Sequence, residues 1–268
     1  MSETMRMLTF NLRLDTPQDG PYRWCHRRDA IGDFLTRLRP ALAGLQEVLP
    51  NMWEDFLIRL PKTFRLFGEP RQDYDEAVPI LYDTEQITFL EGGVFWLSST
   101  PHIKASKDAD AGCIRITTWA RFASVKQPSL TMRVYNTHLD HLSEAARIRG
   151  LKVTLSMIEA HHINHQEPLV LMGDFNALPN SRVFEPLKSF NREMDSNWRL
   201  LDVQADASKG HYPTFHRFSG QATEAIDHLF VSRSVGVKAV DVHLEQQRSH
   251  PLSDHHPLSV LLDFSGCQ

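Results

Sequence analysis

The sequence is short of cysteine and has no long apolar run. Its three cysteines, Cys25, Cys113 and Cys267, are odd in number and far apart, which argues against a disulfide framework and against a structural zinc site. No apolar stretch near Met1 has the length of a signal-peptide core or of a membrane-spanning helix. We therefore expect a cytoplasmic protein with reduced cysteines and no association with membranes.

Positive charge is not in excess either. The formal net charge is −4, and the lysines and arginines are dispersed rather than gathered in blocks. Proteins that bind long nucleic acids gain much of their affinity by neutralising phosphates, and their composition usually shows it. Duplex DNA is therefore a less expected partner, although a basic cleft is compatible with an acidic protein.

The chain also lacks a Gly/Ser/Pro-rich linker, so we predict a single domain over residues 1–268. Its composition, 41% hydrophobic and 23% charged, is typical of a globular protein. Runs of strands mixed with a few helices favour an α+β fold in which two packed sheets are covered by helices. The expected strands cover 6–13, 41–48, 79–82, 87–90, 94–98, 114–122, 130–138, 168–174, 226–232 and 258–264; the expected helices cover 24–38, 52–60 and 144–162, with a short loop-helix region at 182–187 and an irregular stretch at 191–221.

The strand at 168–174 carries the most informative pattern. Its apolar run predicts a buried strand, which the turn-forming residues that follow end at Asp174. Side chains alternate in extended chain, so Asp174 and Asn176 are expected on one side and Phe175 on the core side. A carboxylate can deprotonate water or hold a cation, and an amide can donate to an anionic oxygen. The alternative explanation is a polar turn at the end of the strand.

Polar side chains recur at the ends of the other expected strands. Because the strand ends at one edge of a sheet lie together, we expect these side chains to line one cleft. They are Asn11, Glu47, His138 with Asp140, Asp227, and Asp254 with His255.

Six short motifs around these residues resemble the endonuclease/exonuclease/phosphatase superfamily, the fold of deoxyribonuclease I. They follow the family's order over nearly the whole chain. The Asn136-Thr137-His138-Leu139 form looks like a bacterial branch nearer the deadenylases, and repair nucleases often carry tyrosine at the position of His138. The resemblance implies a four-layer α/β/β/α sandwich with mainly antiparallel sheets. The motifs are Thr9-Phe10-Asn11, Gln46-Glu47, Asn136-Thr137-His138-Leu139-Asp140-His141, Gly173-Asp174-Phe175-Asn176, Ile226-Asp227-His228 and Ser253-Asp254-His255-His256-Pro257-Leu258.

The resemblance also implies a cofactor, Mg²⁺ or Mn²⁺ in its place, bound by Glu47 with Asn11 and Asp254. The cation would offset charge that builds on the phosphate during hydrolysis.

The other motif residues would act on water and phosphate. Asp174 would orient or deprotonate the attacking water, and Asn176 would donate to a phosphoryl oxygen. His255 would be the catalytic histidine, held by Asp227, and His138 would contact phosphate or help the leaving group. Whether Asp174 or His255 takes the water's proton stays open at this point.

Several further residues have two readings. Arg115 is either a phosphate clamp or a surface arginine, and Asp140 and His141 are either substrate contacts or ordinary loop polarity. Asn136, which belongs to the same motif as His138, is expected to contact substrate. Arg27 is more expected as a surface charge than in the cleft. Thr214-Phe215-His216 is a further candidate for facing the cleft, whereas His161 and His165, at a zinc-ligand spacing, are expected on a solvated helix end.

We expect a Mg²⁺-dependent phosphohydrolase that cleaves a phosphomonoester or phosphodiester of a small molecule or short oligonucleotide. The alternatives are a deadenylase-like or exonuclease-type nuclease acting on RNA or DNA, and an inactive protein that binds a phosphorylated ligand. Nothing in the sequence indicates a protein partner.

Overall fold

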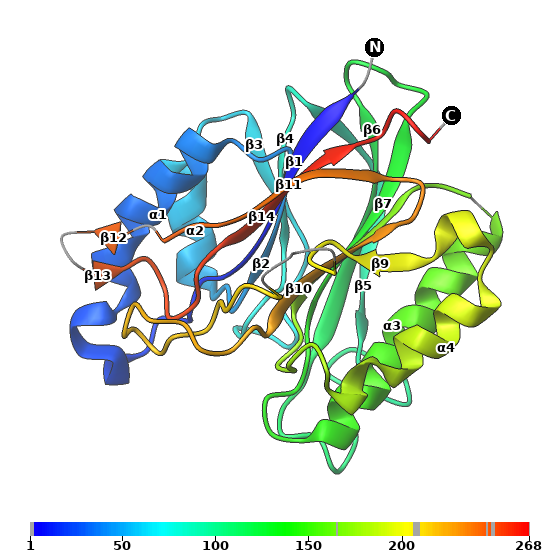
Figure 1. The fold of residues 1–268 in the computed structure, drawn as a ribbon. Helices are drawn as coiled ribbons and strands as arrows, with labels where there is room; N and C mark the ends of the chain where they lie inside the picture. Colours follow the sequence, from blue (N-terminus) through cyan, green and yellow to red (C-terminus); the bar gives the residue numbers. More distant parts are fainter. Residues whose placement is uncertain (1–2, 165, 206–209, 245, 248–249, 268) are drawn as a thin grey trace.

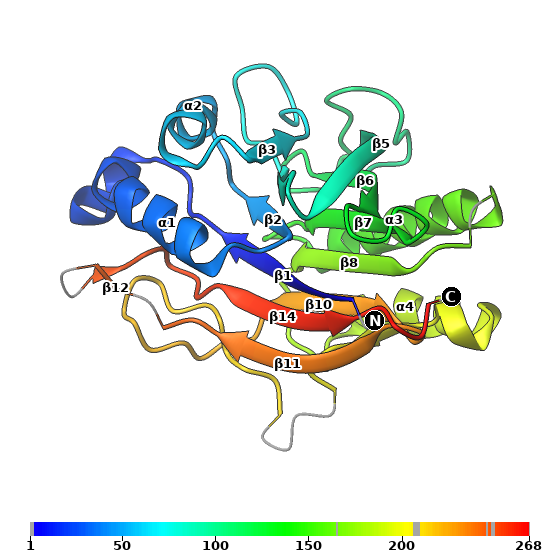
Figure 2. The ribbon, with the colours of Figure 1, turned by 90° about the horizontal axis from the view of Figure 1, so that it is seen from above.

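Two six-stranded sheets pack against each other, and four helices cover their outer faces (Figure 1). The structure is a computed structural model that describes residues 3–164, 166–205, 210–244, 246–247 and 250–267. Seen from above, the sheets form the middle of the molecule, with α1 (Trp24–Leu38) and α2 (Pro50–Arg59) on one side and α3 (Glu144–Asn164) and α4 (Glu185–Glu193) on the other (Figure 2). The predicted four-layer α/β/β/α sandwich is confirmed.

Each sheet contains one parallel pair of strands, and its other pairs are antiparallel. In the first sheet β1 and β2 are parallel, and in the second β7 and β8 are. The first sheet has the order β11 (Gly236–Val242), β14 (Leu258–Asp263), β1 (Thr4–Asn11), β2 (Leu42–Gln46), β4 (Ile80–Asp83), β3 (Phe64–Phe67); the second has the order β5 (Ile87–Trp96), β6 (Ile116–Ser124), β7 (Thr131–His138), β8 (Leu169–Asp174), β10 (Asp227–Ser232), β9 (Leu200–Asp202).

Smaller elements complete the described chain. A two-stranded ribbon joins β12 (Gln246–Gln247) to β13 (His250–Pro251), and three short 3-10 helices are η1 (Pro17–Tyr22), η2 (Arg182–Phe184) and η3 (Ser196–Trp198). No helix among the described residues is long and apolar enough to cross a bilayer. The three cysteines are all unpaired.

Strand alternation divides the apolar residues between three layers of core. On β8, Val170 and Met172 pack between the two sheets, whereas Leu169 and Leu171 pack under the helices of the second sheet. Strands β1, β7 and β10 alternate in the same way, because successive side chains of a strand point to opposite faces. Each strand therefore has a side that faces the space between the sheets.

Some predicted boundaries were wrong. The two strands expected at 87–90 and 94–98 are one strand, β5, whose register shifts between Phe89 and Glu91. The extra residue of such a bulge interrupts the alternation on which the prediction rested. Strands β3, β9, β11, β12 and β13 were not predicted, since they are short or carry no clear alternation of apolar and polar residues, and β9 lies within the stretch expected to be irregular.

Candidate active site

The polar residues at the strand ends lie on the side that faces the other sheet. Asp174 continues the alternation of Val170 and Met172 on β8, and Asp227 is paired directly with it across β10. Asn11 and His138 follow the same alternation on β1 and β7. The hydrophobic pattern that orients each strand therefore also directs its terminal polar residue into the space between the sheets.

Asp174 and His138 border a cavity of about 250 Å³. The predicted residues that line it are Glu47, Arg115, His138, His141, Asp174, Asn176, Asp254 and His255. Asn11 and Asp227 are not part of the lining but bond to Asp174 and His255, which are. Side chains that were not among those predictions also line it, including Arg13, Glu76 and Ile226.

Asn11 links two of the carboxylates. Its Nδ2 donates to Glu47 Oε1 at 3.1 Å and to Asp174 Oδ2 at 3.0 Å. The other Glu47 oxygen, Oε2, accepts from the backbone N–H of Leu14 at 2.9 Å. Glu47 itself has a positive φ of 62°, an unusual conformation for a glutamate, and such strained positions cluster at functional sites.

His255 is held by Asp227 and faces Asp174. Its Nδ1 lies 2.7 Å from Asp227 Oδ2, and its Nε2 lies 3.9 Å from Asp174 Oδ2. Burial alone would lower the pKa of His255, but Asp227, together with Asp254 and Asp174, raises it to about 10. Burial and the charge of Asp227 raise the pKa of Asp174. The predicted pairing of Asp227 with His255 is therefore present in the structure.

His138 lies between Arg115 and Asp174. Arg115 donates from Nη1 to His138 Nδ1 at 2.8 Å, so the His138 proton belongs on Nε2, which lies 3.4 Å from Asp174 Oδ2. Burial, and then the positive charge of Arg115, holds the pKa of His138 well below its usual value. Arg115 is buried at this position, and its Nη1 also lies 3.5 Å from Glu76 Oε2. It is a cavity residue and not a surface arginine.

Asn176 reaches the cavity by a route different from the predicted one. Its φ of 47° takes it out of the extended chain, and its side chain lines the cavity while Nδ2 donates to Leu139 O at 3.1 Å. Its backbone N–H donates to Asp174 Oδ1 at 2.8 Å, so a tight turn places Asn176 beside Asp174. Phe175 is buried, as predicted.

Asn136 and Asp140 are not part of the cavity lining. Asn136 is fully buried between the sheets, where Oδ1 accepts from Gln46 Nε2 at 2.7 Å and Nδ2 is shared by the carbonyls of Leu45, Val78 and Pro79. Both oxygens of Asp140 accept from backbone N–H groups of Gly112, Cys113, Leu142 and Ser143. Direct substrate contact by these two residues is therefore not consistent with their positions.

Two surface predictions were wrong. Arg27 is only 2% exposed, and its guanidinium donates to the carbonyls of Leu12, Arg13, Tyr22 and Leu252, which ties α1 to the segments that carry Asn11 and Asp254. His161 is half-buried, with its Nδ1 at 2.8 Å from the Tyr135 hydroxyl and its ring on Trp119. The zinc-ligand spacing cannot be followed further, because His165 lies outside the described residues.

Two further cavity residues differ in whether the sequence indicated them. Phe215, in the stretch noted as a candidate for facing the cleft, lies with its ring centroid 4.7 Å from that of His255. Glu76 lies in a connection before β4, at no predicted strand end, so no signal in the pattern could have found it.

The donor set of the cavity fits a hard divalent cation. Four carboxylates line it, those of Glu47, Glu76, Asp174 and Asp254. Burial and then Glu47 raise the pKa of Glu76, and burial also raises the pKa of Asp254, to which the charge of Glu47 contributes. Because a cation would relieve this mutual repulsion, oxygen-preferring ions such as Mg²⁺ suit the site.

A second arrangement is also close enough to hold a metal ion. Asp174, Asp227 and His255 each place one ligand atom within 4.8 Å of the others. However, Mg²⁺ prefers oxygen ligands to an imidazole nitrogen, so the Glu47 side of the cavity, where carboxylates gather, is the better candidate.

A carboxylate-rich cavity with a buried His–Asp pair, set between two sheets, suits metal-assisted hydrolysis. Residues 8–255 match the sequence model of the Endonuclease/Exonuclease/phosphatase family. The chain therefore belongs to this family, as the sequence motifs indicated.

Individual relatives agree with this assignment. Nocturnin of Mus musculus is 26% identical over 260 residues, which are 91% of this chain and 59% of nocturnin. The matched region spans 24–59% of the curated relatives' own lengths. Among solved structures, an endonuclease/exonuclease/phosphatase family protein from Bacteroides thetaiotaomicron has a TM-score of 0.89 at 26% identity, covering 99% of this chain and 96% of that one. A mannosyl-6-phosphatase from the same species has a TM-score of 0.86 at 27% identity, covering 96% of this chain and 99% of that one.

Proposed function

We propose that this protein is a Mg²⁺-dependent phosphohydrolase that cleaves a phosphomonoester of a small molecule by attack of an activated water. The observation that carries the proposal is the arrangement around Asp174 Oδ2, where Asn11, His138 and His255 converge within 3.0, 3.4 and 3.9 Å. Around it lie the carboxylates for a cation and the donors for a phosphate.

The cation would be held by Glu47 and Asp254, and Asn11 would position Glu47 through the hydrogen bond from its Nδ2. When bound, Mg²⁺ supplies positive charge that stabilises the phosphate oxygens as the ester bond breaks. Glu47 is suited to this role because both of its oxygens are already oriented, by Asn11 Nδ2 and by the Leu14 N–H. An oriented ligand loses less conformational entropy when the cation binds.

Asp174 would orient the water and take its proton. An ionised carboxylate only accepts hydrogen bonds, and Asp174 is fixed by Asn11 on one oxygen and by the Asn176 N–H on the other. His255 would then present Nε2 to the phosphate or the leaving group, since Asp227 engages its Nδ1. Asn176, Arg115 and His138 supply further N–H groups for the phosphoryl oxygens.

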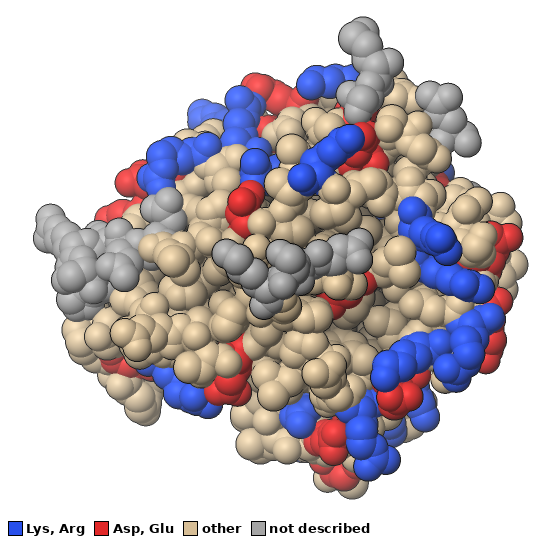
Figure 3. All heavy atoms as spheres, in the orientation of Figure 1, with Lys and Arg blue, Asp and Glu red and all other residues tan. Residues whose placement is uncertain are grey.

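Three findings favour a small substrate. The cavity is small, about 250 Å³, and Phe215 and Ile226 help to enclose it. On the face shown in Figure 3, basic and acidic side chains of the described residues are interspersed near the outline of the molecule. The mannosyl-6-phosphatase among the similar structures is a protein whose name states a small phosphorylated sugar as substrate.

A substrate panel tests the proposal. The wild-type protein is assayed with Mg²⁺ and with EDTA on p-nitrophenyl phosphate, its bis-ester, sugar and inositol phosphates, a short RNA, and single- and double-stranded DNA. We expect monoester hydrolysis that EDTA abolishes and that falls by at least about a thousandfold in Asp174→Asn.

The other outcomes are equally informative. Preference for oligonucleotides over monoesters would support a nuclease, the reading that the Asn136-Thr137-His138-Leu139 motif keeps open. Equal inactivity of the wild type and Asp174→Asn on every compound would support a protein that only binds a phosphorylated ligand.

A further inference from the structure

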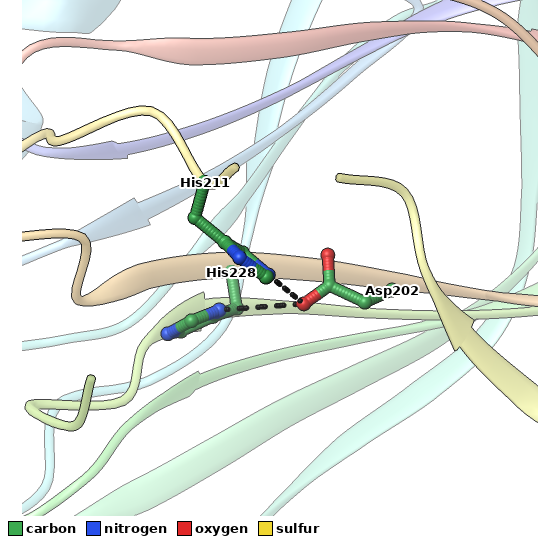
Figure 4. Close-up of side chains that lie close together, drawn as sticks. All are labelled: Asp202, His211 and His228. Atoms are coloured by element: carbon green, nitrogen blue, oxygen red, sulfur yellow. Dashed lines mark hydrogen bonds and ion pairs between the residues drawn. The ribbon is translucent and has the colours of Figure 1, made fainter. Parts of the chain in front are cut away.

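A second group of potential metal ligands lies on the opposite face of the second sheet. Asp202 ends β9, His228 lies on β10 directly after Asp227, and His211 belongs to the segment that follows β9 (Figure 4). One ligand atom from each lies within 4.8 Å of the other two. By the alternation of β10, His228 points to the helix-covered side, where its ring contacts Phe175 and Phe184.

His228 has an unpaired nitrogen that points at a carboxylate. The side chain is 1% exposed, and its Nε2 lies 2.9 Å from the carbonyl oxygen of Ala177, to which it must donate. In the neutral imidazole Nδ1 then carries the lone pair; it has no hydrogen-bond partner and lies 3.7 Å from Asp202 Oδ2. A lone pair that faces a carboxylate oxygen in a buried place is unfavourable unless a positive charge lies between them.

Oδ2 of Asp202, the oxygen that faces His228, also contacts His211. His211 Nε2 lies 2.8 Å from Asp202 Oδ2, and Figure 4 shows both imidazoles turned to this one oxygen. The other oxygen, Oδ1, accepts from the Gln204 N–H at 2.9 Å. Gln204 Oε1 in turn accepts from the Tyr212 N–H at 2.8 Å, which holds the His211 segment next to β9. The three ligand atoms are thus positioned by contacts outside the group.

The separations are compatible with a tetrahedral site. With metal–ligand bonds of about 2.0–2.1 Å, neighbouring ligand atoms around Zn²⁺ lie about 3.3 Å apart. The two distances from Asp202 Oδ2, 2.8 and 3.7 Å, lie on either side of this value. The bond from His228 Nε2 to the Ala177 carbonyl is also the kind of outer contact that fixes the tautomer of a metal-binding histidine.

We propose that Asp202, His211 and His228 form a second metal site that binds Zn²⁺ through Oδ2, Nε2 and Nδ1, with a water as fourth ligand. Two imidazoles and one carboxylate favour Zn²⁺ over Mg²⁺, which prefers oxygen ligands. The site is structural: it joins β9, β10 and the segment of His211. Through His228 Nε2 it also fixes the carbonyl of Ala177, three residues after Asp174.

Zinc retention tests the site independently of catalysis. The protein is stripped with a chelator, loaded with Zn²⁺ and separated from free metal in excess Mg²⁺, which occupies the oxygen-rich cavity. We expect the wild type and the exposed-histidine control His102→Asn to retain one equivalent of zinc. His211→Asn and Asp202→Asn should bind zinc at least about a hundredfold more weakly, because each loses a direct ligand.

Bound Co²⁺ provides a spectroscopic check of the same ligands. Its visible absorption should report a four-coordinate nitrogen and oxygen environment in the wild type and should be lost in His211→Asn, whose fold is verified by circular dichroism. Retention of equal zinc by the wild type and His211→Asn, or no retention by either, would overturn the proposal. Neither result would bear on phosphate hydrolysis, since the readout is metal content.

Discussion

Single side chains around the cavity differ in how much of their hydrogen-bonding capacity the protein already uses. The amide of Asn136 is fully hydrogen-bonded to backbone carbonyls and to Gln46, so its role is structural. Asn176 Nδ2 donates one N–H to Leu139 O, and its second N–H is available to a ligand. Residue type alone does not distinguish the two asparagines, and only the surrounding contacts do.

His161 provides a test at this scale that is separate from catalysis. Burial, with a contribution from Arg133, lowers its pKa from 6.5 to about 4. Because the unfolded chain then binds more protons between these pH values, the protein should lose stability as the pH falls from 6.5 towards 4. Urea unfolding across this range should show a steeper loss in the wild type than in His161→Gln. His102→Gln, at an exposed position, should follow the wild type, and parallel curves for all three proteins would contradict this account.

The sequence could locate the residues that end apolar strands, because the same apolar pattern defines the strand and its orientation. It therefore found Asn11, Glu47, Asp174 and His255. The pattern shows which face of a strand a residue is on but not how deeply it is buried between the sheets. Asn136 was therefore predicted to contact substrate, although it is fully buried. Arg27 was misplaced for a related reason, since four carbonyls from separate segments bury its guanidinium and no local pattern reveals them.

At the scale of elements, the parallel pairing of β7 with β8 holds Asp174 in place. His138 is paired with Asp174, and Thr137 with Gly173. Gly173 has a φ of 149°, and a Cβ there would lie 2.0 Å from the carbonyl oxygen of Thr137. The end of β8 can therefore approach β7 only with glycine at this position.

Gly173→Ala should separate these strands. We expect it to lower the free energy of unfolding by at least about 3 kcal/mol, since it combines an unfavourable φ with a backbone clash. Gly20→Ala is the matched control: its φ is 52°, but nothing lies within 4 Å of its would-be Cβ, so a loss of about 1 kcal/mol is expected. Equal losses in urea unfolding would show that the close approach of β8 to β7 does not matter.

At the scale of the whole molecule, the site exists only because the two sheets are aligned. Glu47 follows β2 of the first sheet, whereas Asp174 and Asp227 belong to the second. Between the sheets Asn136 Nδ2 donates across to the carbonyls of Leu45 and Pro79 at 2.9 and 2.8 Å. This contact fixes the offset between the two halves of the site.

Asn136→Asp should weaken that alignment. The substitution keeps the shape but replaces donors with oxygens that face backbone carbonyls, so unfolding should become easier by at least about 2 kcal/mol. The rate of phosphate release should fall in the folded protein as well. Asn180→Asp makes the same chemical change at an exposed position and should alter neither quantity. Unchanged stability in Asn136→Asp would mean that other contacts align the sheets.

The most direct test of the account is the Mg²⁺ concentration that gives half-maximal hydrolysis of a phosphomonoester. After removal of metal with EDTA, the wild type and the exposed-carboxylate control Glu54→Gln should recover together as Mg²⁺ is added back. Glu47→Gln should require at least about ten times more Mg²⁺, because it loses a charged ligand. Full activity of the metal-free protein, or the same Mg²⁺ requirement in Glu47→Gln, would contradict a cation held at the meeting point of the two sheets.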